Sequence, residues 1–555
     1  MNGDETSPRH VPLTLTLSPS DGEREQPPDG SGFSNSPLSV ASGLRFCRTT
    51  VRSWSCVRLL KRRRIILPLP FGRGERWGEG QLRTNFTIGG FRSQTLWYGF
   101  LFALLAVLIS GCGKPAKRAN CELPIYFTCD TRGRLEPCGC FDGQFGGLTR
   151  LKTVLDGEAP DNALRVDVGD AIAGSEDYDL IEYEYLLRAF ATLKFDALNI
   201  GHREAQLTAA QLGEIKKSSP VPILSANLLE KSTGKPIFDS SKIIARGGFR
   251  IALIGVLDPR GLGDELGTGL AIGDMDSAIT RCLAEVRGKV DVVVLLAFTD
   301  EETLARLAQQ FYEAHVILGG KVRQPAQELR KENRSLVYFV TNESRALGIL
   351  RLQLAEGVSP KPLRNEIRLL HDKIPQDKSF RQLAQEYRDE VRRTKLAVDD
   401  PSKARADMVP GVRVAASYVG SQRCVECHKT AGAVWAKSGH AEAFDTLVAR
   451  KADADPKCIA CHTIGFGSMS GYRREFGAEK MVHVGCESCH GPGSLHVRRH
   501  EGDKTIDFAY RPLGAGDCQK CHYGEFSRPF YWYEFWPPIK HGKEPPQTAA
   551  SGAAD

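Results

Sequence analysis

The sequence predicts a layered α/β domain followed by a mainly α-helical C-terminal segment. Short apolar runs alternate with helical stretches between Leu123 and about Leu354. A polar stretch, Asp399–Val409, then interrupts this pattern. Beyond it lie nine of the 13 His and eight of the 16 Cys of the 555-residue chain. Such a concentration of imidazole and sulfur is typical of a cofactor-binding region.

The formal net charge of +7 is modest for this length. No block of like charges indicates a nucleic-acid surface, so we expect no nucleic-acid partner.

Residues 1–91 are rich in Pro, Gly, Ser and Arg and show neither helical nor strand periodicity. Two interpretations stay open for them. The start codon is assigned too far upstream, with the true start near Arg92–Leu96, or the segment is a genuine disordered extension. Residues 546–555 are expected to be a disordered tail.

Residues 92–111 are interpreted as a lipoprotein signal peptide. Arg92 precedes the apolar run Leu96–Ile109, which is too short to span a bilayer comfortably. The run ends in Ile109-Ser110-Gly111-Cys112, which matches the bacterial lipoprotein cleavage pattern, with the Cys112 thiol as lipid acceptor. An uncleaved N-terminal helix is the alternative. We therefore expect a lipid-anchored protein at the periplasmic face or cell surface.

Residues 112–370 are assigned to the α/β domain. Helices are expected at Tyr183–Leu193 and Glu301–Phe311. Strands are expected at Pro124–Thr128, Leu164–Val168, Ala197–Ile200, Val221–Ser225, Ile251–Val256, Val292–Leu296, Val316–Leu318 and Leu336–Val340.

Polar motifs sit at or just after the ends of several of these strands, where α/β sites usually assemble. They are Cys129–Pro137, Gly146–Leu148, Asp167–Asp170, Gly201–Glu204, Ser225–Asn227 and Leu318–Gly320. Over roughly 230 residues this set resembles the calcineurin-like metallophosphoesterases, specifically the N-terminal domain of exported 5'-nucleotidases.

The resemblance implies a two-metal site, but most ligand positions carry other residues. Asp130 and Asp170 are retained, and Asn227 stands in its motif. The replacements are Arg132, His202-Arg203, Ala297, Lys321 and Arg323. Guanidinium and ammonium groups would repel two dications, so we do not expect phosphoesterase activity. The degenerate pocket is either an inert scaffold or an anion site for phosphate or carboxylate.

Disulfide pairing of Cys121, Cys129, Cys138 and Cys140 is plausible outside the cytoplasm, but the partners cannot be read from the sequence.

Residues 371–415 are interpreted as a helical linker. Within it, Asp377–Leu396 is expected to form an exposed, charge-rich helix, with Leu383, Tyr387 and Val391 at helical spacing. Pro401 marks the domain boundary.

Residues 416–545 contain four Cys-x-x-Cys-His motifs, at Cys424-Cys427-His428, Cys458-Cys461-His462, Cys486-Cys489-His490 and Cys518-Cys521-His522. In each, two thiols and an imidazole share one face of a helical turn. The thiols add to the two haem vinyl groups and the imidazole ligates the iron. The motifs therefore predict four covalently bound c-type haems.

Each iron has a second axial position. The candidates for it are His440, His483, His496, His500 and His541, with Met469 and Met481 as the nearby thioethers. Five spare histidines for four irons favour bis-His ligation. His483 is the weakest candidate.

These residues resemble the tetrahaem cytochrome c family typified by the electron carrier of ammonia-oxidising bacteria. The likeness spans about Tyr418 to Lys543 and includes Gly439–Ala443, Cys461–Gly467 and Val484–Gly493. In that family three haems are bis-His and one is five-coordinate. The resemblance implies His440, one of His496 and His500, and His541 as the distal ligands.

The sequence thus predicts an exported electron-transfer protein whose partners are other redox proteins or quinol-linked donors. An oxidoreductase acting on a small nitrogen compound at an open haem is the alternative. A 5'-nucleotidase-type hydrolase is a further, weaker alternative.

Overall fold

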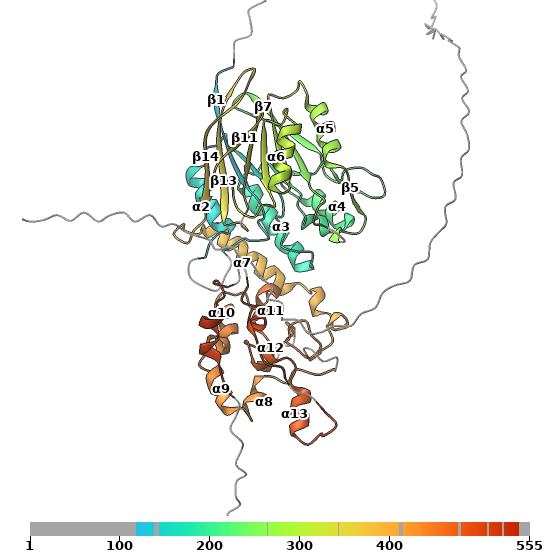
Figure 1. The fold of residues 1–555 in the computed structure, drawn as a ribbon, viewed down its shortest axis with the longest axis vertical. Helices are drawn as coiled ribbons and strands as arrows, with labels where there is room; N and C mark the ends of the chain where they lie inside the picture. Colours follow the sequence, from blue (N-terminus) through green and yellow to red (C-terminus); the bar gives the residue numbers. More distant parts are fainter. Residues whose placement is uncertain are drawn as a thin grey trace, which may run out of the picture. The chain divides into compact units, whose positions relative to one another are not determined.

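A computed structural model describes residues 118–137, 144–262, 265–341, 343–409, 415–475, 479–507, 510–523 and 527–542. Within these ranges the chain forms an α/β domain followed by a series of short helices (Figure 1). This confirms the predicted fold class. The segment 92–111 and Cys112, Cys138 and Cys140 lie outside the described residues. Among the described helices, none has the length and apolar character needed to cross a membrane.

The first sheet combines four parallel strands with an antiparallel hairpin. Its order is β14-β13-β1-β2-β3-β4, in which β1 pairs in parallel with β2 and antiparallel with β13. The strands are β1 (Cys121–Thr128), β2 (Leu164–Asp167), β3 (Ala197–Asn199), β4 (Ile223–Leu224), β13 (Ala346–Ala355) and β14 (Val358–Leu369).

The second sheet is also mixed, with order β11-β12-β10-β9-β7-β6 and parallel pairing from β7 through β9 and β10 to β12. Its strands are β6 (Ser241–Arg246), β7 (Phe249–Leu257), β9 (Val292–Phe298), β10 (Val316–Gly320), β11 (Arg330–Glu332) and β12 (Ser335–Phe339). A separate two-stranded sheet pairs β5 (Leu228–Glu230) with β8 (Leu270–Ile272).

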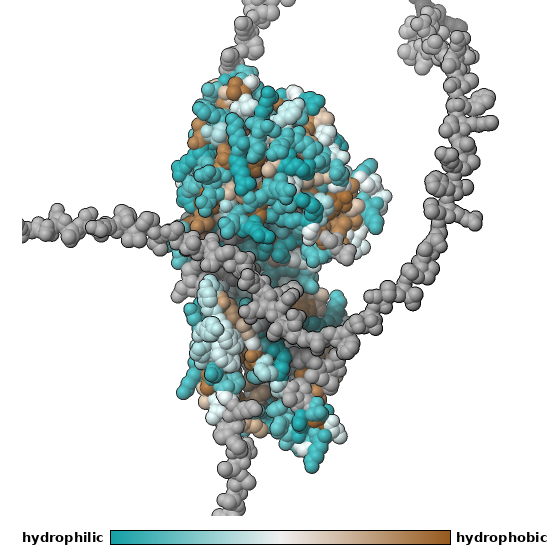
Figure 2. All heavy atoms as spheres, viewed as in Figure 1, coloured by the Kyte–Doolittle hydropathy of each residue, from teal (hydrophilic) through white to brown (hydrophobic). Residues whose placement is uncertain are grey.

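Helices cover the sheets because their apolar stripes match the buried strand faces. Helix α5 (Met275–Val286) packs on β7, and α6 (Glu301–Gln310) packs on β10 and β12 (Figure 1). The remaining helices of the domain are α2 (Leu148–Glu158), α3 (Asp177–Thr192) and α4 (Ala209–Ser218). β9 is buried along its whole length, as expected for a central parallel strand. The outer surface of the domain is largely hydrophilic in the view of Figure 2.

All eight predicted strands are present, and their ends differ from the predicted ends by at most three residues. The hairpin β13–β14 was not among the predicted strands. β14 is mostly exposed and polar, so its residues lack the apolar run that marked the other strands.

The linker helix is α7 (Lys378–Arg393), which begins one residue later and ends three residues earlier than predicted. The Asp377 carboxylate caps it by accepting a hydrogen bond from the Phe380 amide at 3.1 Å. Phe380, Ala384, Tyr387 and Val391 form a buried face, and α7 packs against α2 and α3.

The C-terminal segment is built from short helices. They are α8 (Ser421–Val425), α9 (Lys429–Trp435), α10 (Ala443–Ala449), α11 (Pro456–His462), α12 (Cys486–His490), α13 (Ser494–His500), α14 (Ala515–Cys518) and α15 (Trp532–Phe535). Its largest cluster of buried apolar side chains is Leu447, Ala452, Ile459, Ile464, Tyr472 and Met481. This core is far smaller than that of the α/β domain.

Candidate functional site

The four Cys-x-x-Cys-His motifs each form a helical turn. In the first and fourth, the histidine amide donates to the carbonyl of the first cysteine, from His428 to Cys424 and from His522 to Cys518, both at 2.9 Å. The second and third motifs lie inside α11 and α12. Each turn therefore presents two sulfurs and an imidazole on one side, as the sequence spacing requires.

Three of the four motif histidines face a second histidine from elsewhere in the segment. The ring centroids are 5.8 Å apart for His428 and His496, and 6.0 Å apart for His490 and His541. They are also 6.0 Å apart for His522 and His440. Two metal–imidazole bonds of about 2 Å each, extended by the two ring radii, give a centroid separation of roughly 6 Å. The spacing of all three pairs fits an iron between the rings.

Hydrogen bonds at Nδ1 orient several of these rings. His462 Nδ1 lies 2.5 Å from the Ala443 carbonyl oxygen, and His541 Nδ1 lies 3.0 Å from that of Ile539. His522 Nδ1 lies 3.1 Å from Ser527 Oγ, whose own hydroxyl donates to the Arg528 carbonyl. Each acceptor favours the tautomer with the proton on Nδ1, which leaves Nε2 as the lone-pair donor for a metal.

His483 has the opposite arrangement. Its Nδ1 accepts a hydrogen bond from the Phe444 amide at 3.2 Å, near the start of α10. A neutral imidazole that accepts at Nδ1 carries its proton on Nε2, so Nε2 is not available as an iron ligand. The residue also has a positive φ of 70°. His483 therefore acts as a helix-capping group in this structure.

His500 lies beside His496, with ring centroids 4.6 Å apart on α13. Of the two, His496 is the one whose ring faces His428. Burial lowers the pKa of His496, as does the neighbouring His500. A lowered pKa keeps the imidazole neutral, which is the form that binds a metal.

The attachment cysteines of different motifs lie next to one another. The thiol of Cys424 interacts electrostatically with that of Cys486, and the thiol of Cys461 with that of Cys521. Cys489 and Cys518 are also close enough to interact electrostatically. These interacting pairs link the motifs in the order first, third, fourth, second. No disulfide is present among the described cysteines, which include Cys121 and Cys129.

The degenerate pocket predicted from the phosphoesterase resemblance is called the remnant pocket below. It lies at the carboxyl ends of the strands β1 and β2. Asp130 and Arg132 follow β1, and Arg132 Nε lies 2.5 Å from Asp130 Oδ1. Arg132 Nη1 is also 2.5 Å from Glu343 Oε1, which in turn contacts Arg134 through its other oxygen at 3.2 Å. Asp130 and Arg132 both have positive φ, a backbone conformation that few non-glycine residues adopt.

Asp170 follows β2 and accepts a hydrogen bond from the Arg203 amide at 2.9 Å. The Arg203 guanidinium is 3.9 Å from the other carboxylate oxygen. Burial raises the pKa of Asp170 to about 7 and that of Asp130 to about 6. The positive charges of Arg132 and Arg203 thus lie beside the two retained carboxylates, where metal ions would supply charge in the family that the sequence resembles.

The other predicted pocket residues have different neighbours. His202 Nε2 lies 2.7 Å from the Asp258 carbonyl, and Lys321 Nζ donates to the Arg260 carbonyl. Asn227 is buried, where it donates to the Leu257 carbonyl and accepts from the Leu257 amide. Ala297 is fully buried in β9. Arg323 makes no hydrogen bond or ion pair with the described part of the chain.

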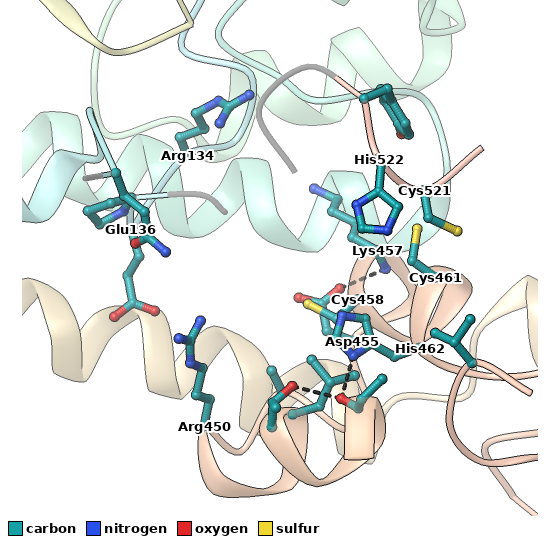
Figure 3. A pocket seen from close by; sticks show the side chains of 18 of the residues that line it. Arg134, Glu136, Arg450, Asp455, Lys457, Cys458, Cys461, His462, Cys521 and His522 are labelled. Carbon is teal, nitrogen blue, oxygen red and sulfur yellow. Dashed lines mark hydrogen bonds between the residues drawn. The ribbon is translucent and has the colours of Figure 1, made fainter. Parts of the chain in front are cut away.

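A cavity of about 2040 Å³ joins the two parts of the site. Arg132 and Arg203 of the α/β domain line it, as do Cys458, His462 and His522 of the helical segment. Figure 3 shows Arg134 and Glu136 on one side of this space, opposite His522 and Cys461.

Sequence reasoning missed several residues that line this cavity, among them Glu343, Glu182 and Lys457. Lys457 directly precedes Cys458, so the sequence itself places it beside the second motif. Glu343 and Glu182 carried no such signal, because no motif brings them near the site.

Comparison with known proteins agrees with this division of the chain. Residues 423–491 match the family model described as "Cytochrome c554 and c-prime". Cytochrome c-554 of Nitrosomonas europaea is 36% identical over 103 residues, which cover 16% of this chain and 42% of that protein. The 5'-nucleotidase of Vibrio cholerae is 27% identical over 215 residues, which cover 36% of this chain and 38% of that protein. The chain thus spans less than half the length of either relative.

Solved structures similar to the chain include a 5'-nucleotidase precursor from Thermus thermophilus and the calcineurin-like phosphoesterase YfkN from Bacillus subtilis. The first has a TM-score of 0.43 at 20% identity, covering 49% of this chain and 59% of that one. The second has a TM-score of 0.42 at 19% identity, covering 49% of this chain and 98% of that one. The chain therefore joins an α/β domain similar to 5'-nucleotidases to a segment that matches the cytochrome c554 and c-prime family, which implies covalently bound c-type haem.

Proposed function

We propose that the protein is a four-haem electron carrier, exported and held at a membrane by a lipid on Cys112. When bound, c-type haem supplies a one-electron carrier whose potential depends on its axial ligands and surroundings. The observation that carries the proposal is the set of three histidine pairs at 5.8 to 6.0 Å, each built on a Cys-x-x-Cys-His turn.

The chain's own residues support a relay. Cysteines of the first and third, the third and fourth, and the fourth and second motifs interact electrostatically, which supports a connected series of four attachment points. Five of the six histidines in these pairs are half-buried, which limits the access of water to their ring nitrogens, whereas His541 is exposed.

The proposed location is the periplasmic face or the cell surface. The signal-like segment 92–111 and the lipoprotein cleavage pattern at Cys112 support it. Other redox proteins or quinol-linked donors are the proposed partners.

The test is a haem count on the protein purified from membranes. Pyridine haemochrome absorbance and the intact mass should give four haems per chain, with an N-terminus at lipidated Cys112. Fewer haems, or peptides from residues 1–84 in the mature protein, would contradict the corresponding part of the proposal. Spectra of the reduced protein with and without nitric oxide then separate a relay of six-coordinate haems from an oxidoreductase with an open one.

A further inference from the structure

A buried charge cluster connects the α/β domain to the second haem-attachment motif. Lys457 Nζ lies 3.1 Å from Asp179 Oδ1 and also contacts Glu182 Oε2. Both carboxylates belong to α3, whereas Lys457 belongs to α11, the helix that carries Cys458 and His462. The side chains of Asp179 and Glu182 are 7% and 10% exposed, so water screens this contact weakly.

A third carboxylate completes the cluster. Asp455 caps α11 by accepting from the Lys457 amide at 3.0 Å, and it accepts from the Tyr387 hydroxyl at 3.2 Å. The groups that face the cluster from the surrounding elements are Tyr178 of α3 and Tyr387 and Arg388 of α7.

Three carboxylates face one ammonium group in this cluster. Ionising three like charges at a buried site is costly, so this environment disfavours the charged form of a carboxyl group. Burial raises the pKa of Glu182 to about 7, with Lys457 acting in the opposite direction. The Glu182 carboxyl group can therefore gain or lose a proton near neutral pH.

A second element of the α/β domain lies against Glu182. Gly133, in the loop after β1, has a φ of 72°, and a Cβ atom placed on it would lie 1.8 Å from Glu182 Oε2. This loop also carries Arg132 and Arg134 of the remnant pocket. The cluster, Cys458 and His462 all line the same cavity.

We propose that Glu182, supported by Asp179, Asp455 and Lys457, is a proton-accepting site coupled to reduction of the haem centre attached at Cys458 and Cys461. This inference rests on the proposed function. One electron from the donor adds one negative charge beside the cluster, and the Glu182 carboxylate takes up one proton from solvent. Oxidation returns the electron to an acceptor and the proton to solvent. Electron transfer through this centre is then linked to proton transfer at the boundary with the α/β domain.

The experiment is a spectroelectrochemical titration of the haem-loaded full chain between pH 5.5 and 8.5. One couple should fall in midpoint potential as pH rises, approaching about 59 mV per pH unit, the one-electron equivalent of a tenfold change in proton concentration. Glu182→Gln should flatten this dependence and hold the potential near its low-pH value. Glu136→Gln is the matched control, since Glu136 lines the same cavity but forms a one-to-one pair with Arg388. It should leave the slope unchanged.

A wild-type protein in which every couple is independent of pH would overturn the inference, as would a Glu182→Gln variant with the wild-type slope. If that variant does not load haem, the infrared difference spectrum of the wild type decides. Reduction should produce a protonated carboxyl band that shifts in deuterated water, and its absence overturns the inference. Failure of the proposed function has a different signature, namely the absence of haem or of any reversible couple.

Discussion

The imidazole of His440 lies opposite that of His522, with ring centroids 6.0 Å apart and the ring planes inclined at 48°. The two residues come from different helical turns, and the gap between their rings is the space that an iron with two axial imidazoles would take.

We expect His440→Ala to convert one low-spin haem to high-spin while all four haems stay attached, because the thioether bonds do not depend on the distal ligand. His541→Ala should do the same for the centre at His490. Electron paramagnetic resonance and the haem count measure the two effects. His483→Ala is the control. It should leave the spin state unchanged and cost about 1 kcal/mol of stability through loss of the acceptor for the Phe444 amide.

His496 and His500 should differ in the same assay. His496 faces His428, whereas His500 stands beside His496 on α13. His496→Ala should therefore give a high-spin centre, and His500→Ala should not. A high-spin signal in the His500 variant alone would reverse the assignment of the first pair.

The sequence predicted those features that have a local signature. The Cys-x-x-Cys-His turns and the parallel strands of the α/β domain follow from spacing and apolar runs over a few residues. For the distal iron ligands, the sequence left several candidate histidines. The packing of short helices decides which histidine faces which motif. His483 was one of these candidates. Its Nδ1 accepts a hydrogen bond from the Phe444 amide, and this contact depends on where α10 packs, which has no local signature in the sequence.

The contacts of the remnant pocket were harder to predict for the same reason. Arg132 was placed beside Asp130 by its motif, and the structure brings the two together. Glu343, which neutralises both Arg132 and Arg134, lies more than 200 residues away in sequence. Lys321, like Arg132, replaces a metal-ligating residue of the family that the sequence resembles, yet it donates to the Arg260 carbonyl in the segment after β7.

Stability of the α/β domain should depend on pH through Asp170. Burial, followed by the charge of Glu204, raises its pKa to about 7. Because this folded-state pKa is above that of an unfolded aspartate, the stabilisation is fully present below about pH 4 and is lost as pH rises through 7. Asp170→Asn should therefore lose less stability than the wild type between pH 5 and pH 8, by on the order of 2 kcal/mol. Urea unfolding followed by circular dichroism measures the difference.

Asp258 provides the control of opposite sign. Despite its burial, hydrogen bonds from Arg260 and Thr299 lower the pKa of Asp258 to about 2. Its stabilisation is present above about pH 4 and is lost as pH falls through 2. Asp258→Asn should thus be less stable than the wild type at both pH 5 and pH 8. Equal pH dependence in the wild type and Asp170→Asn would show that Asp170 does not titrate in this range.

The remnant pocket should hold no stoichiometric manganese or zinc, and no iron beyond that of haem. The guanidinium groups of Arg132 and Arg203 lie against the retained carboxylates and would repel a dication. Inductively coupled plasma mass spectrometry measures the content of each metal relative to the haem iron. Nucleotide hydrolysis by the purified protein should be absent. The double variant Arg132→His with Arg203→His should bind manganese or zinc more tightly than the wild type. Metal in the wild-type pocket, or nucleotidase turnover, would show that the arginines do not exclude the ions.

Removal of haem should unfold the helical segment and leave the α/β domain folded. The helices of the segment are four to seven residues long, which is too short for stability without packing. Its main apolar cluster has six buried members, so the haem groups must supply most of the packing surface.

A variant with all eight motif cysteines changed to Ser should be cleaved by trypsin throughout residues 416–542. A resistant fragment ending near α7 should remain, because Phe380, Tyr387 and Val391 are buried against α2 and α3. Full resistance of the haem-free segment would mean that its protein core suffices, whereas loss of the α/β fragment as well would make the contacts of Lys457 with Asp179 and Glu182 essential to both parts.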